Sequence, residues 1–298
     1  MGVARSRCFG AETVETVDAA RFGSRAERLG RGAHGEVWRY VSARGTSVAV
    51  KETDARRAAS GGVGRFALER AREEWKMQRA CACESVVEAY AWLEDEKAPT
   101  ARLVLEYCAR GAATDEREEF EPFDLDDVRR MLRSILRALR VCHSRDVVHH
   151  DVKPQNVFVT ADGTYKLGDF GCATRVARDV ETGVAELVGK TPGTPAFTAP
   201  ECCEGEPADG FKADVWAAGM TAHALATGAY AYQAENAWET YQKILNSPVD
   251  FTAVDARGDE AFSDLMRKIL ERDPARRLSA SEALKHSWFS RDEADDER

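Results

Sequence analysis

The feature that most constrains the fold is a glycine-rich turn between two strand-like segments. Gly30, Gly32 and Gly35 belong to the sequence Gly-Arg-Gly-Ala-His-Gly-Glu-Val over residues 30–37. Because glycine has no Cβ, such a turn can bend tightly and bring its backbone close to a phosphate group. The pattern also occurs in dinucleotide-binding units, but there it opens a helix. Here strand-like sequence continues to Tyr40, so we expect a β-hairpin around the turn.

A lysine and two polar motifs follow this hairpin in a fixed order. The next strand-like segment, Val48–Lys51, ends on the lysine. The sequence His-His-Asp-Val-Lys-Pro-Gln-Asn occupies residues 149–156, and Asp169-Phe170-Gly171 begins thirteen residues after its last position. Each motif alone could arise by chance. Their order and spacing behind a glycine-rich turn are highly specific for one fold.

These motifs resemble those of the eukaryotic protein kinase superfamily, and the resemblance covers residues 25–290. It implies an α+β, bilobal fold. A small β-rich N-lobe with one main helix is expected at about residues 25–108, and a larger helical C-lobe at about 109–290. Residues 1–24 are expected to form a mobile N-terminal tail, and residues 291–298 an acidic C-terminal tail.

The resemblance implies a protein serine/threonine kinase that uses ATP and Mg²⁺. Asp151 would accept or orient the proton of the substrate hydroxyl, Lys153 would neutralise charge on the moving phosphoryl group, and Lys51 would contact the α/β-phosphates. Asn156 and Asp169 would hold Mg²⁺, because amide and carboxylate oxygens suit this hard cation. Lys153 at this offset from the aspartate is typical of Ser/Thr rather than Tyr kinases. The residues expected to bind ATP are Gly30, Arg31, Gly32, Ala33, His34, Gly35, Val37, Ala49, Lys51, Glu106, Cys108 and Phe158.

Three later segments resemble structural parts of the same superfamily. These segments are Gly193–Glu201, Asp214–Trp216 and Asp273–Arg277. By this resemblance, Glu201 and Arg277 form a buried ion pair that holds the substrate-positioning loop. Asp214 braces the catalytic loop, and Thr194 bridges the catalytic aspartate and lysine.

A glutamate on the helix expected at residues 66–82 should orient Lys51. Counting back from Val86 without gaps selects Glu74. A one-residue insertion would instead select Glu73, so both positions are candidates. We choose Glu74 as the residue that orients the lysine.

Within the superfamily, three stretches are similar to the calcium/calmodulin-dependent protein kinase kinases and to the plant kinases that activate SNF1-related kinases. These stretches are residues 193–203, 214–221 and 241–248. Such enzymes phosphorylate a Thr in the activation loop of a downstream kinase, so the expected substrate is another kinase. The calmodulin-binding tail of the animal members is not visible in the sequence. The alternatives are a Ser/Thr kinase with unrelated substrates and a pseudokinase scaffold, which the retained catalytic and metal residues disfavour.

One position departs from the pattern of the superfamily. His149-His150-Asp151 stands where His-Arg-Asp is usual, and in most kinases that arginine holds a phosphate on the activation loop. Histidine is a weaker, pH-dependent cation that is mostly neutral at cytosolic pH. We hypothesise that activity does not depend on activation-loop phosphorylation, although the loop offers Thr191 and Thr182 as candidate phosphosites. Alternatively, His150 relaxes regulation with little consequence.

Composition limits the remaining classes of function. The net charge of −9 argues against nucleic-acid binding, which needs a basic surface. The 8 cysteines lack zinc-site spacing and are expected to be free thiols in the cytoplasm or nucleus. No transmembrane span is expected. Gly2 lies in an N-myristoylation pattern, but a single acyl chain would anchor only marginally, so we expect no stable membrane insertion and a monomer.

Overall fold

The computed structural model describes residues 22–32, 35–54, 63–95, 100–114, 120–179, 185–189 and 193–290. Several sequence predictions fall elsewhere in the chain. The tail residues 1–21 and 291–298, the turn residues Ala33 and His34, and the candidate phosphosites Thr182 and Thr191 lie outside the described residues.

The chain divides into two compact units, and each is described by itself. The first unit contains the chain up to Glu73 together with Ala89–Tyr107. The second contains Glu74–Glu88 and the chain from Cys108 onward. The first unit is built on a β-sheet and the second mainly from helices, which confirms the predicted α+β class.

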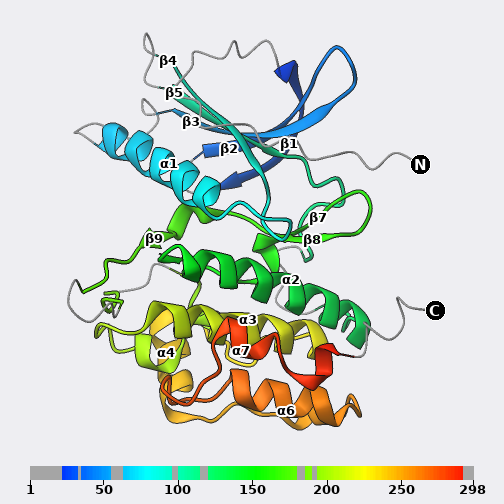
Figure 1. Cartoon of the computed structure of the whole chain (residues 1–298), viewed down its shortest axis with the longest axis vertical. Coiled ribbons are helices and arrows are strands. Elements are labelled where there is room, and N and C mark those ends of the chain that lie inside the picture. Colours follow the sequence, from blue (N-terminus) through cyan, green and yellow to red (C-terminus); the bar gives the residue numbers. More distant parts are fainter. Residues whose placement is uncertain are drawn as a thin grey trace. The chain divides into compact units, whose positions relative to one another are not determined.

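The first unit is a five-stranded antiparallel sheet with the order β1-β2-β3-β5-β4 (Figure 1). Its strands are β1 (Ser24–Gly32), β2 (Gly35–Val41), β3 (Ser47–Asp54), β4 (Ala89–Asp95) and β5 (Thr100–Glu106). Tyr40, Val48, Val50 and Val104 form its buried core. Burial of these β-branched and aromatic side chains fits a half-buried pleated sheet. The strand–turn–strand order predicted around the glycines is therefore confirmed.

Helix α1 (Val63–Ala80) contains most of the helix predicted at residues 66–82. It begins and ends earlier than the sequence pattern indicated. Its buried side chains include Ala71, Glu74 and Met77, which recur at the spacing of one helix face.

Helix α2 (Leu125–Ser144) begins directly after Asp124. The carboxylate of Asp124 accepts a hydrogen bond from the backbone N–H of Asp127 (2.8 Å) and caps the helix. This bond satisfies one of the amides that a helix N-terminus leaves without an intrahelical partner. Val128, Leu132 and Leu139 are buried on its inner face.

Helix α3 (Gly210–Thr227) is the central helix of the second unit. Figure 1 shows it lying beside α2, and the two helices are in contact. Most of its side chains are buried, and it ends at Gly228, whose φ of 81° is the left-handed conformation that glycine adopts readily. Within the described residues, no helix combines the length and apolar character needed to cross a membrane.

Shorter elements complete the second unit. Its strands pair as β6 (Val147–Val148) with β9 (Thr174–Arg175), and as β7 (Val157–Val159) with β8 (Tyr165–Leu167). Its remaining α-helices are α4 (Ala237–Asn246), α5 (Thr252–Asp255), α6 (Glu260–Ile269) and α7 (Ala280–Ala283). Its short 3-10 helices are η2 (Pro154–Asn156), η3 (Phe170–Cys172), η4 (Pro195–Phe197), η5 (Pro200–Cys202) and η6 (Ser287–Phe289). Ser279 and Glu282 form a capping box at the start of α7.

The packing of α3 predicts the effect of a small substitution. A Cβ at Gly219 would lie 2.5 Å from Cγ2 of Ile269 and 2.7 Å from Cδ2 of Leu270. Gly219→Ala should therefore destabilise the protein by about 1–3 kcal/mol through overpacking, although alanine gains about 1 kcal/mol in helix propensity. Thermal unfolding should show a lower Tm.

The matched control is Gly189→Ala, where a Cβ would meet no described atom within 4 Å. This control should leave the Tm nearly unchanged. A Tm for Gly219→Ala equal to or above that of the wild type would contradict the prediction.

Candidate active site

A buried carboxylate holds the loop that follows β6. Asp214, in the first turns of α3, accepts hydrogen bonds from the backbone N–H of His149 (2.8 Å, to Oδ2) and of His150 (2.9 Å, to Oδ1). His143 Nε2 lies 3.0 Å from Oδ2 of the same carboxylate. Burial alone would raise the pKa of Asp214, but the hydrogen bond and charge of His143 bring that pKa below its ordinary value. The predicted bracing of the catalytic loop by Asp214 is confirmed.

Asp151 lies at the centre of a hydrogen-bonded cluster. Its Oδ1 accepts bonds from the hydroxyl of Thr194 (2.8 Å) and from the backbone N–H of Thr194 (3.1 Å). Lys153 Nζ donates to the same hydroxyl oxygen (2.7 Å) and lies 2.9 Å from Oδ2 of Asp151. Thr194 therefore bridges the carboxylate and the ammonium group, as predicted. The cluster fixes the direction of a carboxylate that can accept a proton.

Asn156 is tied to the same carboxylate. Its Nδ2 donates to the backbone oxygen of Asp151 (2.7 Å) and to Oδ2 of Asp151 (3.0 Å). Its backbone oxygen accepts from the N–H of Gly168 (2.9 Å), which joins η2 to the residue before Asp169. These bonds connect the two motifs that the sequence separates by thirteen positions.

Asp169 is held in an uncommon backbone conformation. Its φ is 54°, in the left-handed region, and its Oδ1 accepts a bond from the N–H of Gly171 (3.3 Å). The next side chain, Phe170, is buried and packs edge-on against His149 with ring centroids 4.8 Å apart. His149 Nε2 donates to the carbonyl of Gly168 (3.1 Å). Packing on both sides therefore holds the backbone that carries the exposed carboxylate of Asp169.

The donor set of Asn156 and Asp169 fits Mg²⁺. Because the amide nitrogen of Asn156 is engaged with Asp151, the amide oxygen is the atom left to face a cation. Asp169 adds an exposed carboxylate. Magnesium takes oxygen ligands and binds through one or two such groups while keeping waters and phosphate oxygens.

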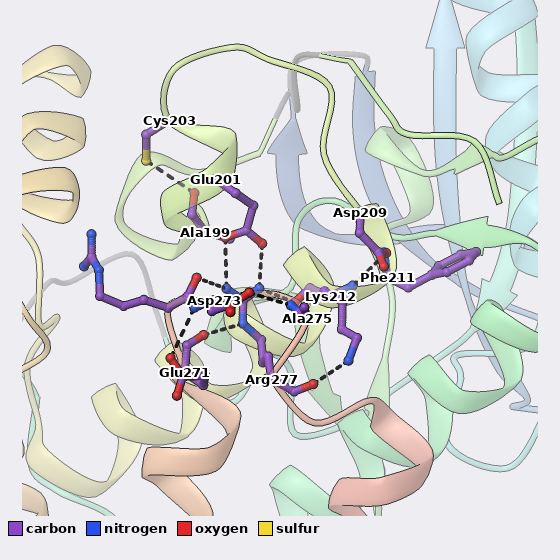
Figure 2. Close-up of polar contacts among 11 residues, drawn as sticks. Ala199, Glu201, Cys203, Asp209, Phe211, Lys212, Glu271, Asp273, Ala275 and Arg277 are labelled. Carbon is purple, nitrogen blue, oxygen red and sulfur yellow. Dashed lines mark hydrogen bonds and ion pairs between the residues drawn. The ribbon is translucent and has the colours of Figure 1, made fainter. Parts of the chain in front are cut away.

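The substrate-positioning loop is anchored by an ion pair (Figure 2). The guanidinium of Arg277 makes two bonds to the carboxylate of Glu201, at 2.6 Å and 2.9 Å, and its side chain is fully buried. Arg277 also donates to the backbone oxygens of Glu271 and Lys212, both at 2.8 Å, and lies 5.0 Å above the ring of Trp216. The predicted ion pair is confirmed, with the Arg277 side chain fully buried and the Glu201 side chain partly buried. Lys212, whose ammonium donates to the carbonyl of Arg277, was not anticipated from the sequence.

Among the described residues of the first unit, those expected to contact ATP lie on β1, β2, β3 and β5. Val37 is opposite Lys51 across the β2–β3 pair. Ala49 and Lys51 share one face of the sheet, because side chains two positions apart point the same way. Gly35 has φ 155°, and a Cβ there would lie 1.9 Å from the backbone oxygen of Glu52, so this position requires glycine.

The two glutamates considered for Lys51 differ in burial. Glu74 is 4% exposed, whereas Glu73 is exposed. The buried position favours Glu74 as the member of an ion pair, since a buried carboxylate needs a compensating charge or hydrogen bonds. Lys51 belongs to the first unit and Glu74 to the second, so their pairing stays a prediction.

His150 makes a contact that the sequence did not reveal. Its Nε2 lies 2.8 Å from Oγ1 of Thr174, which is on β9. Burial lowers the pKa of His150, although the nearby charge of Asp214 acts in the opposite direction. The imidazole is therefore neutral at neutral pH.

The ion pair between Arg277 and Glu201 predicts that two Arg→Ala substitutions lower the unfolding free energy by very different amounts. Arg277→Ala leaves Glu201 without its partner and should cost about 3–5 kcal/mol in unfolding free energy. Arg267→Ala removes another bidentate pair, with Asp255, but both side chains are about half exposed. The loss there should stay within about 0–1 kcal/mol. Urea unfolding of both variants measures the difference, and equal losses would contradict it.

Comparisons with known proteins agree with this geometry. The sequence matches the family described as "Protein kinase domain" over residues 24–289. The serine/threonine-protein kinase TOS3 of Saccharomyces cerevisiae is 29% identical over 245 residues, which is 74% of this chain and 44% of that protein. The serine/threonine-protein kinase GRIK2 of Arabidopsis thaliana is 36% identical over 162 residues, or 54% of this chain and 38% of that protein.

A third relative has "protein kinase kinase" in its name. The calcium/calmodulin-dependent protein kinase kinase cmkC of Emericella nidulans is 32% identical over 197 residues, or 65% of this chain and 37% of that protein. This chain therefore spans less than half the length of each of these three relatives. Because the family match covers residues 24–289 and contains every hydrogen-bonded group of the Asp151 cluster, the chain belongs to the protein kinase domain family.

Proposed function

We propose that this chain is an ATP-dependent protein serine/threonine kinase. The observation that carries the proposal is the set of bonds around Asp151, which joins Thr194, Lys153 and Asn156 to one carboxylate. These bonds join a carboxylate, an ammonium group and a side-chain amide, and phosphoryl transfer uses groups of these kinds. The family match supports it.

The residues take distinct roles in the proposed reaction. The oxygen of a substrate hydroxyl forms a bond to the γ-phosphorus of ATP, the bond to the β–γ bridging oxygen breaks, and ADP leaves. Asp151 accepts or orients the hydroxyl proton, and Lys153 neutralises charge on the phosphoryl group in transit. Asn156 and Asp169 would hold Mg²⁺, and the charge of that ion would offset the negative charge of the phosphates.

The residues of the first unit bind the nucleotide in this proposal. The glycines at 30, 32 and 35 let the backbone approach the phosphates, and Lys51 contacts the α/β-phosphates with Glu74 orienting it. Val37 and Ala49 contact the adenine in this proposal. Glu106 and Cys108 supply backbone hydrogen bonds to the adenine.

We further propose that the substrate is the activation loop of an SNF1-related kinase. Two observations support this class. Residues 193–203, 214–221 and 241–248 are similar to kinases that activate SNF1-related kinases, and cmkC is named as a kinase kinase. A Ser/Thr kinase with unrelated substrates is the second candidate, since the same residues would serve it.

The first experiment measures transfer from Mg-ATP to an inactive SNF1-related kinase catalytic domain. Asp151→Asn should lower turnover about 10²–10⁴-fold, because the proton acceptor is lost. The matched control is Asp264→Asn, which removes an exposed carboxylate on α6 and should leave turnover unchanged. Phosphate should be found on the activation-loop Thr of the substrate domain.

The outcomes separate the two parts of the proposal. Transfer to generic Ser/Thr peptides but not to that domain would retain the kinase and reject the substrate class. Equal turnover in Asp151→Asn and the wild type would reject the catalytic assignment.

The neutral state of His150 leads to a proposal about regulation. A neutral ring offers no charge to an activation-loop phosphate, so activity should not require one. Thr191→Ala should keep the turnover of the wild type in protein treated with phosphatase, and Thr182→Ala should do the same. Loss of activity in Thr191→Ala, with recovery in Thr191→Glu, would contradict this expectation.

A further inference from the structure

The backbone of His150 adopts a conformation that is uncommon for residues other than glycine. Its φ is 66°, in the left-handed region, where a Cβ costs some backbone strain, although histidine occurs there more often than most residues. The backbone N–H donates to Oδ1 of Asp214 (2.9 Å), and the Nε2 contact with Thr174 fixes the ring. Strain of this kind persists only where surrounding contacts over-determine it, and it marks positions with a specific task.

The Nε2 contact spans two segments of the second unit. His150 follows strand β6, and Thr174 is the residue of β9 that pairs with Val148 of β6. The hydrogen bond therefore ties the loop that carries Asp151 to the start of the segment that follows Asp169. This tie is made from a neutral ring and a hydroxyl, with no charged partner in the bond.

The second ring nitrogen has a different environment. Nδ1 of His150 is fully buried and has no hydrogen-bond partner among the described residues. His150 also lines a cavity of about 20 Å³. The polar residues that share this lining are Asp151, Asp214, Thr194 and Thr198.

The size and chemistry of the cavity match one water molecule. A buried polar atom without a partner carries a desolvation penalty that an ordered water can remove. A water needs roughly 10–15 Å³ of such volume and about two to four polar partners. The cavity has the required volume, and His150, Asp151 and Thr194 are among the polar residues that line it. Its walls come from the catalytic loop, from α3 and from the substrate-positioning loop.

We propose that this cavity holds one ordered water bonded to Nδ1 of His150, and that His150 is a positioning residue for Asp151. Through Thr174 on one side and the water on the other, the ring connects the catalytic loop to β9 and to the loop that carries Thr194. The claim that His150 positions Asp151 for turnover rests on the proposed kinase function. The claims about the water and the geometry of the ring are independent of that function.

The charged and titratable groups around the ring agree with a neutral imidazole. Asp214 from α3 raises the pKa of His150, while His149 lowers it, and burial, the largest effect, lowers it further. Asp151 is the neighbouring residue on the same loop. A neutral ring keeps one nitrogen as donor and the other as acceptor, so it can serve Thr174 and a water together.

The first test is a high-resolution crystal structure of the full chain. Density for one water should lie within about 2.7–3.2 Å of Nδ1 of His150, with a second contact to one of the polar groups that line the cavity. A well-ordered cavity without that water, or a ring whose Nδ1 faces away from it, would overturn the proposal. This result does not depend on whether the protein transfers phosphate.

The second test compares variants in phosphatase-treated protein. Thr174→Val removes the hydroxyl but keeps the β-branched shape, and should lower kcat about 3–10-fold, the size expected for one lost neutral hydrogen bond. Thr174→Ser keeps the hydroxyl and should retain the kcat of the wild type. The KM for ATP should stay constant in both, because the ring acts on the position of Asp151.

A double-mutant cycle tests His150 itself. Asn tolerates the left-handed conformation, so His150→Asn should fold while losing the contacts of the imidazole. Its kcat should fall, and adding Thr174→Val should lower it no further, since both changes break the same contact. Additive losses would overturn the positioning role. Absence of transfer in the wild type, with the water present, would instead reject the proposed function.

Discussion

The conformation of the loop that carries Asp151 depends on the hydrogen bonds that the carboxylate of Asp214 accepts. This carboxylate is buried in α3 and accepts bonds from two consecutive backbone amides, those of His149 and His150, and it contacts the ring of His143. A buried charge is costly unless donors compensate for it, so the loop and the carboxylate stabilise each other. The residue that follows these two amides is Asp151. The position of Asp151 is therefore set by the hydrogen bond that the backbone N–H of His150 donates to Asp214.

The same helix also anchors the substrate-positioning loop. Two residues before Asp214, the backbone oxygen of Lys212 accepts from Arg277, and two residues after it the ring of Trp216 lies under the guanidinium. Arg277 in turn holds Glu201 at the end of that loop. Helix α3 is thus the common base for the loop that carries Asp151, the proposed proton acceptor, and for the loop that carries Thr194. A change that shifts α3 should disturb both together.

Sequence reasoning located the groups that belong to motifs and missed those that do not. Asp151, Asn156 and Asp169 follow from the residue order within short motifs. Thr174 was missed, because its contact with His150 joins side chains 24 positions apart and only folding brings them together. Lys212 was missed for the same reason, since its contact with Arg277 spans 65 positions. Spacing gave Glu74 as the choice with Glu73 as the alternative, and the burial of Glu74 favours the same residue.

His150 stands where most protein kinases have an arginine, and this replacement changes which contacts hold the loop in place. An arginine at this position would be a permanent cation that requires an anion to offset its charge. The imidazole avoids that need, because burial outweighs the attraction of Asp214 and keeps the ring neutral. Its bond to Thr174 is then made within the chain and needs no added phosphate. One neutral hydrogen bond is weaker than a bidentate charged pair, so the left-handed backbone of His150 must be held mainly by Asp214 and the surrounding packing.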